Sequence, residues 1–229
     1  MCFLDLLFAI SIIVFLCNVK FVNGGTFNRE LTAVLRDVAM IGIILHHIHN
    51  ELHYFSPIMT QIGYVGTALF FFISGYGNMI SINNKYWLIN KFSKIYVPYI
   101  VVYALFLIFS SCVELNNLSI EEIATDLITV SLPRYVSWFP KIILLCFVLQ
   151  YLSRLLSRNQ TIQLLIVGCV VVSFIVYAYT NQWDSYWYNS VFCYCVGCLF
   201  ANPIVRKKLC IEKLFTFIAL FIVFVPCNF

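Results

Sequence analysis

A cationic side chain and a titratable one, Arg36 and His47, stand eleven residues apart in the apolar run LRDVAMIGIILHH. Eleven helical steps of about 100° come to roughly 1100°, within about 20° of three full turns, so both side chains share one face. A guanidinium can bind phosphate or carboxylate through paired hydrogen bonds, and an imidazole can take a proton from a hydroxyl or receive an acyl group. The alternative, equally weighted from spacing alone, is a snorkelling arginine and a packed histidine.

Two later segments add hydroxyl and ammonium groups. GYVGTALFFFISGYGNMIS carries Ser74 and Tyr76 beside Gly75, and YWLINKFSKIYVPYI carries Lys91 and Lys94 three residues apart on one helix face. For the first segment, close packing of small residues between helices is the simpler interpretation. For the lysines, anchoring at the membrane surface is favoured over contacts to phosphate groups.

Histidines and cysteines also occur at spacings that could bind a metal. These residues are His46, His49 and His53, at i, i+3 and i+7, and Cys193, Cys195 and Cys198, in a C-x-C-x-x-C pattern. The cysteine segment is apolar and has no fourth ligand nearby, so simple packing is favoured there. The histidines are interpreted as interfacial or solvent-facing, with their roles left open, and we expect no metal site.

The elements that must position these groups are apolar throughout. The 229 residues are 62% hydrophobic and 10% charged, with a mean hydropathy of +0.92, whereas a soluble domain carries about 25% charge. The sequence therefore predicts an all-α, polytopic transmembrane helical bundle that binds membrane lipid and no nucleic acid. About eight spans are expected, at 3–22, 33–49, 60–80, 95–113, 136–153, 162–180, 187–202 and 214–227.

The basic residues predict an orientation for these spans. Counting the loops alternately puts twelve Lys and Arg residues on one side and only Arg134 and Lys141 on the other. The positive-inside rule places the twelve in the cytoplasm, so both termini are expected to be external. The longest external connection, about 114–135, contains Ser119 and Glu122 at capping-box spacing, which predicts a short surface helix.

Taken together, the motifs resemble the membrane acyltransferase 3 family, whose members O-acylate cell-surface glycans. The family pattern L-R-x10-H is matched by Leu35, Arg36 and His47. The pattern G-x-x-L-F-F-x-x-S-G-[FY] is matched by Gly66, Leu69, Phe70, Phe71, Ser74, Gly75 and Tyr76. A basic R-x-x-R-I-x-P-x-Y pattern is matched, with lysine replacing both arginines, by Lys91, Lys94, Ile95, Pro98 and Tyr99. Trp138-Phe139 resembles a W-[FY]-L element, and FCYCVGCLFA resembles a later glycine-containing helix.

The resemblance implies an enzyme that moves an acyl group, usually acetyl, from cytoplasmic acyl-CoA to a hydroxyl of a polysaccharide, glycolipid or lipid-linked sugar. By the same resemblance His47 is the catalytic base or acyl acceptor, and Arg36 binds the acyl-CoA. The implied substrate-binding set further comprises Ser74, Gly75, Tyr76, Lys91, Lys94 and Trp138. Acetyl-CoA would serve as co-substrate, and the expected location is the bacterial inner membrane.

The whole chain, 1–229, is expected to be one integral membrane domain, with 3–22 an additional helix and 28–202 the acyltransferase-like core. Family members typically have about ten spans, so this chain is expected to be shortened at its C-terminus. A naturally short member, a fragment and a degenerate copy all fit. A non-enzymatic glycan transporter or assembly partner is the alternative to an enzyme, and an inactive truncated member is another. The acyl group, the acceptor and the oligomeric state, including a homo-oligomer, are left open.

Overall fold

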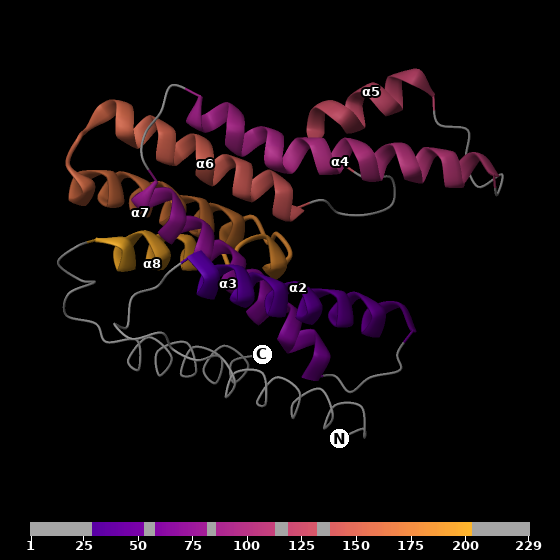
Figure 1. Ribbon diagram of the computed structural model, residues 1–229, viewed down its shortest axis with the longest axis horizontal. Helices are drawn as coiled ribbons and strands as arrows, with labels where there is room; N and C mark the ends of the chain where they lie inside the picture. The colour runs from indigo at the N-terminus through magenta and orange to yellow at the C-terminus, as the bar shows by residue number, and fades with distance from the viewer. Residues whose placement is uncertain (1–28, 53–57, 82–85, 113–118, 132–137, 203–229) are drawn as a thin grey trace. The chain divides into compact units, whose positions relative to one another are not determined.

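The computed structural model describes residues 29–52, 58–81, 86–112, 119–131 and 138–202. Every regular element in these ranges is a helix, which confirms the all-α class (Figure 1). The elements are α2 (Arg29–Leu52), α3 (Ile58–Ile80), α4 (Trp87–Cys112), α5 (Ile120–Thr129), α6 (Trp138–Leu156), α7 (Gln160–Thr180), the 3-10 turn η1 (Ser185–Trp187) and α8 (Phe192–Ala201). The helices expected at 3–22 and 214–227 lie outside the described residues.

Five of the predicted apolar segments each correspond to one helix, from α2 to α4 and then α6 and α7. Among the described residues, α4, α6 and α7 are long and apolar enough to cross a membrane. The total of eight spans stays a prediction. The segment 187–202 was expected to be one span, and this also stays a prediction. Its helix, α8, has only 10 residues, and a rise of about 15 Å is half of a hydrocarbon core.

The short α8 has a local cause at each end. Before it, Ser185–Trp187 forms a 3-10 turn rather than α-helix. After it, Asn202 is extended, with φ −62° and ψ 129°, and it precedes Pro203 in the sequence. Proline disfavours the helical conformation in the residue before it, which ends the helix there.

Contacts divide the chain into two compact units. The first, called the α3 unit, comprises residues 1–80 and 168–229, and its described part contains α2, α3 and α8. Helix α3 packs against both α2 and α8. Phe71 of α3 and Tyr194 and Cys198 of α8 are completely buried. Helix α3 therefore faces protein on two sides.

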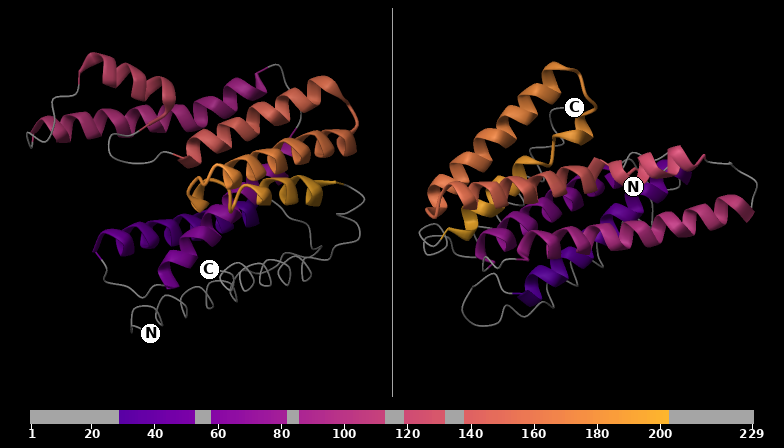
Figure 2. Two further views of the ribbon diagram at one scale, coloured as in Figure 1. Left: turned by 180° about the vertical axis from the view of Figure 1, so that it is seen from behind. Right: turned by 90° about the horizontal axis from the view of Figure 1, so that it is seen from above.

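The second unit, called the α4 unit, comprises residues 81–167 and contains α4, α5 and α6. Helix α4 packs against α6. Helix α5 runs back alongside α4, and its C-terminal end lies near the middle of that helix (Figures 1 and 2). The predicted capping box is confirmed, because the Ser119 hydroxyl accepts from the N–H of Glu122 and the Glu122 carboxylate accepts from the N–H of Ser119.

Candidate functional site

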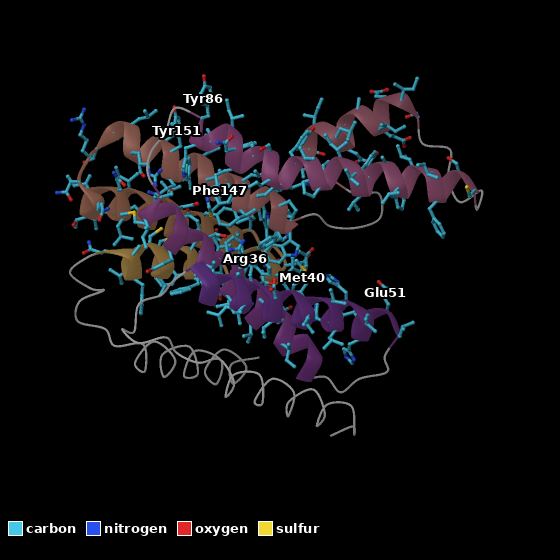
Figure 3. The ribbon with its side chains drawn as sticks, in the orientation of Figure 1. Arg36, Met40, Glu51, Tyr86, Phe147 and Tyr151 are labelled. Atoms are coloured by element: carbon cyan, nitrogen blue, oxygen red, sulfur yellow. The ribbon has the colours of Figure 1, made fainter. Side chains whose placement is uncertain are left out.

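Helix α2 presents two distinct faces, one packed and one exposed. The packed face lies against two glycines of α3. A Cβ added to Gly63 would meet the His46 ring, and a Cβ added to Gly66 would lie 2.8 Å from the Ala39 carbonyl. The packed residues are Leu35, Ala39, Gly42 and His46, and the exposed ones are Arg36, Met40, His47 and Glu51. Arg36, Met40 and Glu51 follow one another along α2 in Figure 3. The helix is therefore held through one stripe and leaves the neighbouring stripe accessible.

Arg36 and His47 both belong to the exposed stripe. Helix α2 runs without interruption from Arg29 to Leu52, so the eleven-residue spacing places both side chains on one face, as the sequence predicts. Met40, about one turn after Arg36, is 48% exposed. The guanidinium and the imidazole are thus carried on one rigid element, roughly 16 Å apart along its axis.

The neighbouring histidine, His46, serves the packing of α2 against α3. Its Nε2 lies 3.2 Å from the Asn50 amide nitrogen, and its ring centroid lies 5.3 Å from that of His47 and 6.0 Å from that of Tyr64. Of the histidines at metal-binding spacing, His53 lies outside the described residues. Across the parts of the chain that the structure describes, no three potential ligands gather closely enough to hold a metal ion.

The candidate residues of α3 lie where this helix meets α8. Ser74 is half-buried, whereas Gly75 and Tyr76 are buried. The Cys198 thiol donates to the Gly75 carbonyl at 3.4 Å, and the backbone of α8 occupies the space that a Cβ on Gly75 would need. Gly75 is therefore required first for helix packing, which was the simpler interpretation of this segment.

In the α4 unit, an aromatic and basic cluster forms around Trp87. The Lys91 ammonium lies 5.7 Å from the Trp87 ring centroid and 5.6 Å from that of Phe147. The Arg154 guanidinium lies 4.5 Å from the Trp87 centroid. The Trp87 Nε1–H donates to the Ser81 hydroxyl at 2.8 Å, which fixes the indole. Cations over an aromatic face gain about 0.5–2 kcal/mol each, so one ring helps to hold two positive charges.

Sequence reasoning missed Arg154 as a site residue. It was counted only as one of the basic residues that set the orientation. Its link to Trp87 joins α6 to α4 across 67 positions in the chain, and no local spacing reveals such a pair. Of the remaining candidates, Lys94 is exposed. Trp138 is half-buried at the beginning of α6, and its ring centroid lies 5.9 Å from that of Phe139.

These features define an all-α integral membrane protein that carries Arg36 and His47 on one helix of the α3 unit and a basic cluster around Trp87 in the α4 unit. Residues 33–228 match the acyltransferase domain of the acyltransferase 3 family. The chain belongs to this family, which confirms the resemblance, and its general activity is that of a membrane acyltransferase. The match extends beyond residue 202, where the family-like core was expected to end. No curated protein and no solved structure matches the chain.

Proposed function

We propose that the protein transfers an acyl group, acetyl in the simplest case, from cytoplasmic acyl-CoA to a hydroxyl of a cell-surface polysaccharide or glycolipid. The observation that carries this proposal is the exposed stripe of α2, which presents Arg36 and His47 together in a chain of the acyltransferase 3 family. Packing of α2 uses the other stripe, so neither side chain is needed to hold the helix against α3.

The reaction requires a base or a nucleophile, and His47 can supply either. As a base it takes the proton of the acceptor hydroxyl while the oxygen attacks the thioester carbonyl. The new C–O bond forms, the C–S bond breaks, and the CoA thiolate leaves and takes up a proton. As an acyl acceptor, His47 instead carries the acyl group between the two substrates.

Arg36 fits an anionic or carbonyl group of the donor, because a guanidinium is permanently charged and presents paired donors. CoA itself carries phosphate groups, for which Lys91, Lys94 and Arg154 are the proposed contacts. The family resemblance adds Ser74, Gly75, Tyr76 and Trp138 as proposed substrate-binding residues. The concentration of basic residues on one side of the predicted spans supports a cytoplasmic donor and external termini, and we place the protein in a bacterial inner membrane.

The proposal is tested by measuring glycan O-acylation in cells that carry the wild type, His47→Ala, Arg36→Ala or Met40→Ala, at matched membrane abundance. Met40 lies on the same exposed stripe and has no acid–base group, so it controls for damage to the surface of α2. We expect acylation to be lost with the first two variants and retained with Met40→Ala. Robust acylation by His47→Ala would overturn the mechanism, and glycan export that continues in that variant without any acylation would favour a transporter.

A further inference from the structure

Three tyrosines of α4 bind the C-terminal end of α5. Tyr96, Tyr99 and Tyr103 lie on one face of α4 at i, i+3 and i+7, with neighbouring ring centroids 5.8 and 5.9 Å apart. The Tyr96 hydroxyl donates to the Leu127 carbonyl at 2.8 Å. The Tyr99 hydroxyl lies 2.8 Å from the Asp126 carbonyl and 2.7 Å from the Ser131 carbonyl. The Tyr103 hydroxyl donates to the Asp126 carboxylate at 3.0 Å.

This tyrosine ladder occupies the centre of α4. The helix has 26 residues and a length of about 39 Å. Tyr96 comes nine residues after Trp87, and Tyr103 comes nine residues before Cys112, so each is about 14 Å from the nearer end. A helix of this length extends at most about 9 Å beyond a hydrocarbon core about 30 Å thick, when all of the excess lies on one side. Wherever the core falls along a spanning α4, the ladder is inside it.

The end of α5 is consequently at the depth of the membrane interior, where its backbone groups have no water to bind. The last carbonyl groups of a helix lack intrahelical donors, and unsatisfied groups in hydrocarbon are costly. Here the Asp126 carbonyl also accepts from the N–H groups of Val130 and Ser131. The Ser131 hydroxyl accepts from the Lys141 ammonium at 2.9 Å. The carbonyl groups of Asp126, Leu127 and Ser131 thus have tyrosine hydroxyls of α4 within hydrogen-bond distance.

The outer face of α5 exposes an apolar side chain near each end of the helix. Ile120 and Ile128 are 87% and 80% exposed within the chain, and no protein in the described structure covers them. The acidic residues of the first turn, Glu121 and Glu122, lie at the opposite end from the tyrosine contacts. The C-terminal end of α5 also carries Asp126 and Thr129, whose polar groups have partners within the protein: the Asp126 carboxylate accepts from the Tyr103 hydroxyl, and the Thr129 hydroxyl donates to the Thr125 carbonyl.

We propose that α5 is a re-entrant helix. It enters the bilayer from the side on which α4 ends at Cys112, follows α4 to mid-depth and turns back at Val130. Lipid acyl chains cover Ile128, and the Asp126 carboxylate is carried into the membrane interior under the Tyr103 hydroxyl. This arrangement differs from the surface helix expected from the sequence, and it is independent of the acyl-transfer proposal.

The matched variants Ile120→Cys and Ile128→Cys test the depth of α5, because the protein itself leaves both positions more than three-quarters exposed. Their reaction with a membrane-impermeant maleimide is followed in open membrane fragments, which give access from both sides. The unmodified chain supplies the background from its ten cysteines, and labelling after denaturation in SDS gives the total for each variant.

We expect Ile128→Cys to react at least tenfold more slowly than Ile120→Cys in membranes, and both to react fully in SDS. Slow reaction of both variants in membranes would place the whole of α5 in lipid and would also support the proposal. Reaction of Ile128→Cys as fast as that of Ile120→Cys would overturn it and return α5 to the aqueous surface. As an independent measurement, a spin label at position 128 should collide more often with oxygen than with a water-soluble nickel complex.

Discussion

Gly75 of α3 lies against the backbone of α8, and Gly197 of α8 lies against the backbone of α3. A Cβ on Gly75 would meet the Tyr194 carbonyl and the Cys198 N–H, and a Cβ on Gly197 would meet the Phe72 carbonyl and the Tyr76 N–H. The two helices therefore approach closely because neither has a side chain at the crossing point. Small residues serve this purpose in membrane proteins, where helix association depends on packing and hydrogen bonds.

Replacing Gly75 by alanine should separate α3 from α8, because the obstructing atoms belong to backbone and cannot rotate away. We expect a loss of about 1–3 kcal/mol in the free energy of unfolding, measured by thermal or denaturant unfolding in detergent. Gly77→Ala is the matched control, since an added Cβ there meets nothing within 4 Å. Equal stability of the two variants would contradict the close contact.

Part of this architecture could be predicted from the sequence, where a local pattern sufficed. The runs of apolar residues located α2 and α3, the spacing of Arg36 and His47 predicted their shared face, and Ser119 with Glu122 predicted the capping box. The 3-10 turn η1 was missed, and the predicted segment 187–202 begins at its last residue, Trp187.

Arg154 should contribute to donor binding if the basic cluster meets the phosphates of CoA. Arg154→Gln is expected to raise the KM for acyl-CoA about tenfold, or about 1.4 kcal/mol, with a smaller effect on kcat. Arg154→Lys should fall between, because it keeps the charge and loses the planar fork. Arg158→Gln removes the same charge from an exposed position and should leave KM unchanged. The measurement is acyl-transfer kinetics at varied acyl-CoA, and identical KM values for the two glutamine variants would remove Arg154 from the site.

Tyr99→Phe should loosen the attachment of α5 to α4. It deletes the hydroxyl that contacts the Asp126 and Ser131 carbonyls and keeps the ring. We expect a loss of about 1 kcal/mol in the free energy of unfolding and faster hydrogen exchange in α5. Tyr179→Phe, at a position that is 70% exposed, is the control and should change neither. Unaltered exchange in α5 would show that the tyrosine contacts do not hold it.

These tyrosine contacts explain why the placement of α5 could not be predicted. Tyr96 and Tyr99 lie 31 and 27 positions from their partners on α5. In the sequence both resemble members of the aromatic belt at a membrane interface. Only the fold shows that their hydroxyls meet the end of another helix. The same applies to Trp87 and Arg154, whose contact depends on how α4 packs against α6.

The beginning of α5 should depend on pH. Hydrogen bonds from the backbone N–H and the hydroxyl of Ser119 hold the pKa of Glu122 below its ordinary value. A carboxylate with a lowered pKa in the folded state stabilises that state above its unfolded pKa, and this contribution is lost as the pH falls through the folded pKa. Acidification below about pH 4.5 should therefore fray the first turn of α5.

Hydrogen exchange of the α5 amides, corrected for the intrinsic effect of pH, measures this fraying. Ser119→Ala should reduce the pH dependence, because it removes the hydroxyl contact to Glu122 and keeps the backbone N–H contact. It should also weaken the helix by about 1 kcal/mol at neutral pH, because it removes the N-cap acceptor. Glu121→Gln leaves both capping-box side chains in place and should preserve the pH response. If Ser119→Ala kept the full response, the Ser119 hydroxyl would not contribute to it. If α5 is re-entrant, the change of hydrogen exchange with pH should be confined to its first turn, because the tyrosine ladder holds the other end inside the membrane, away from water.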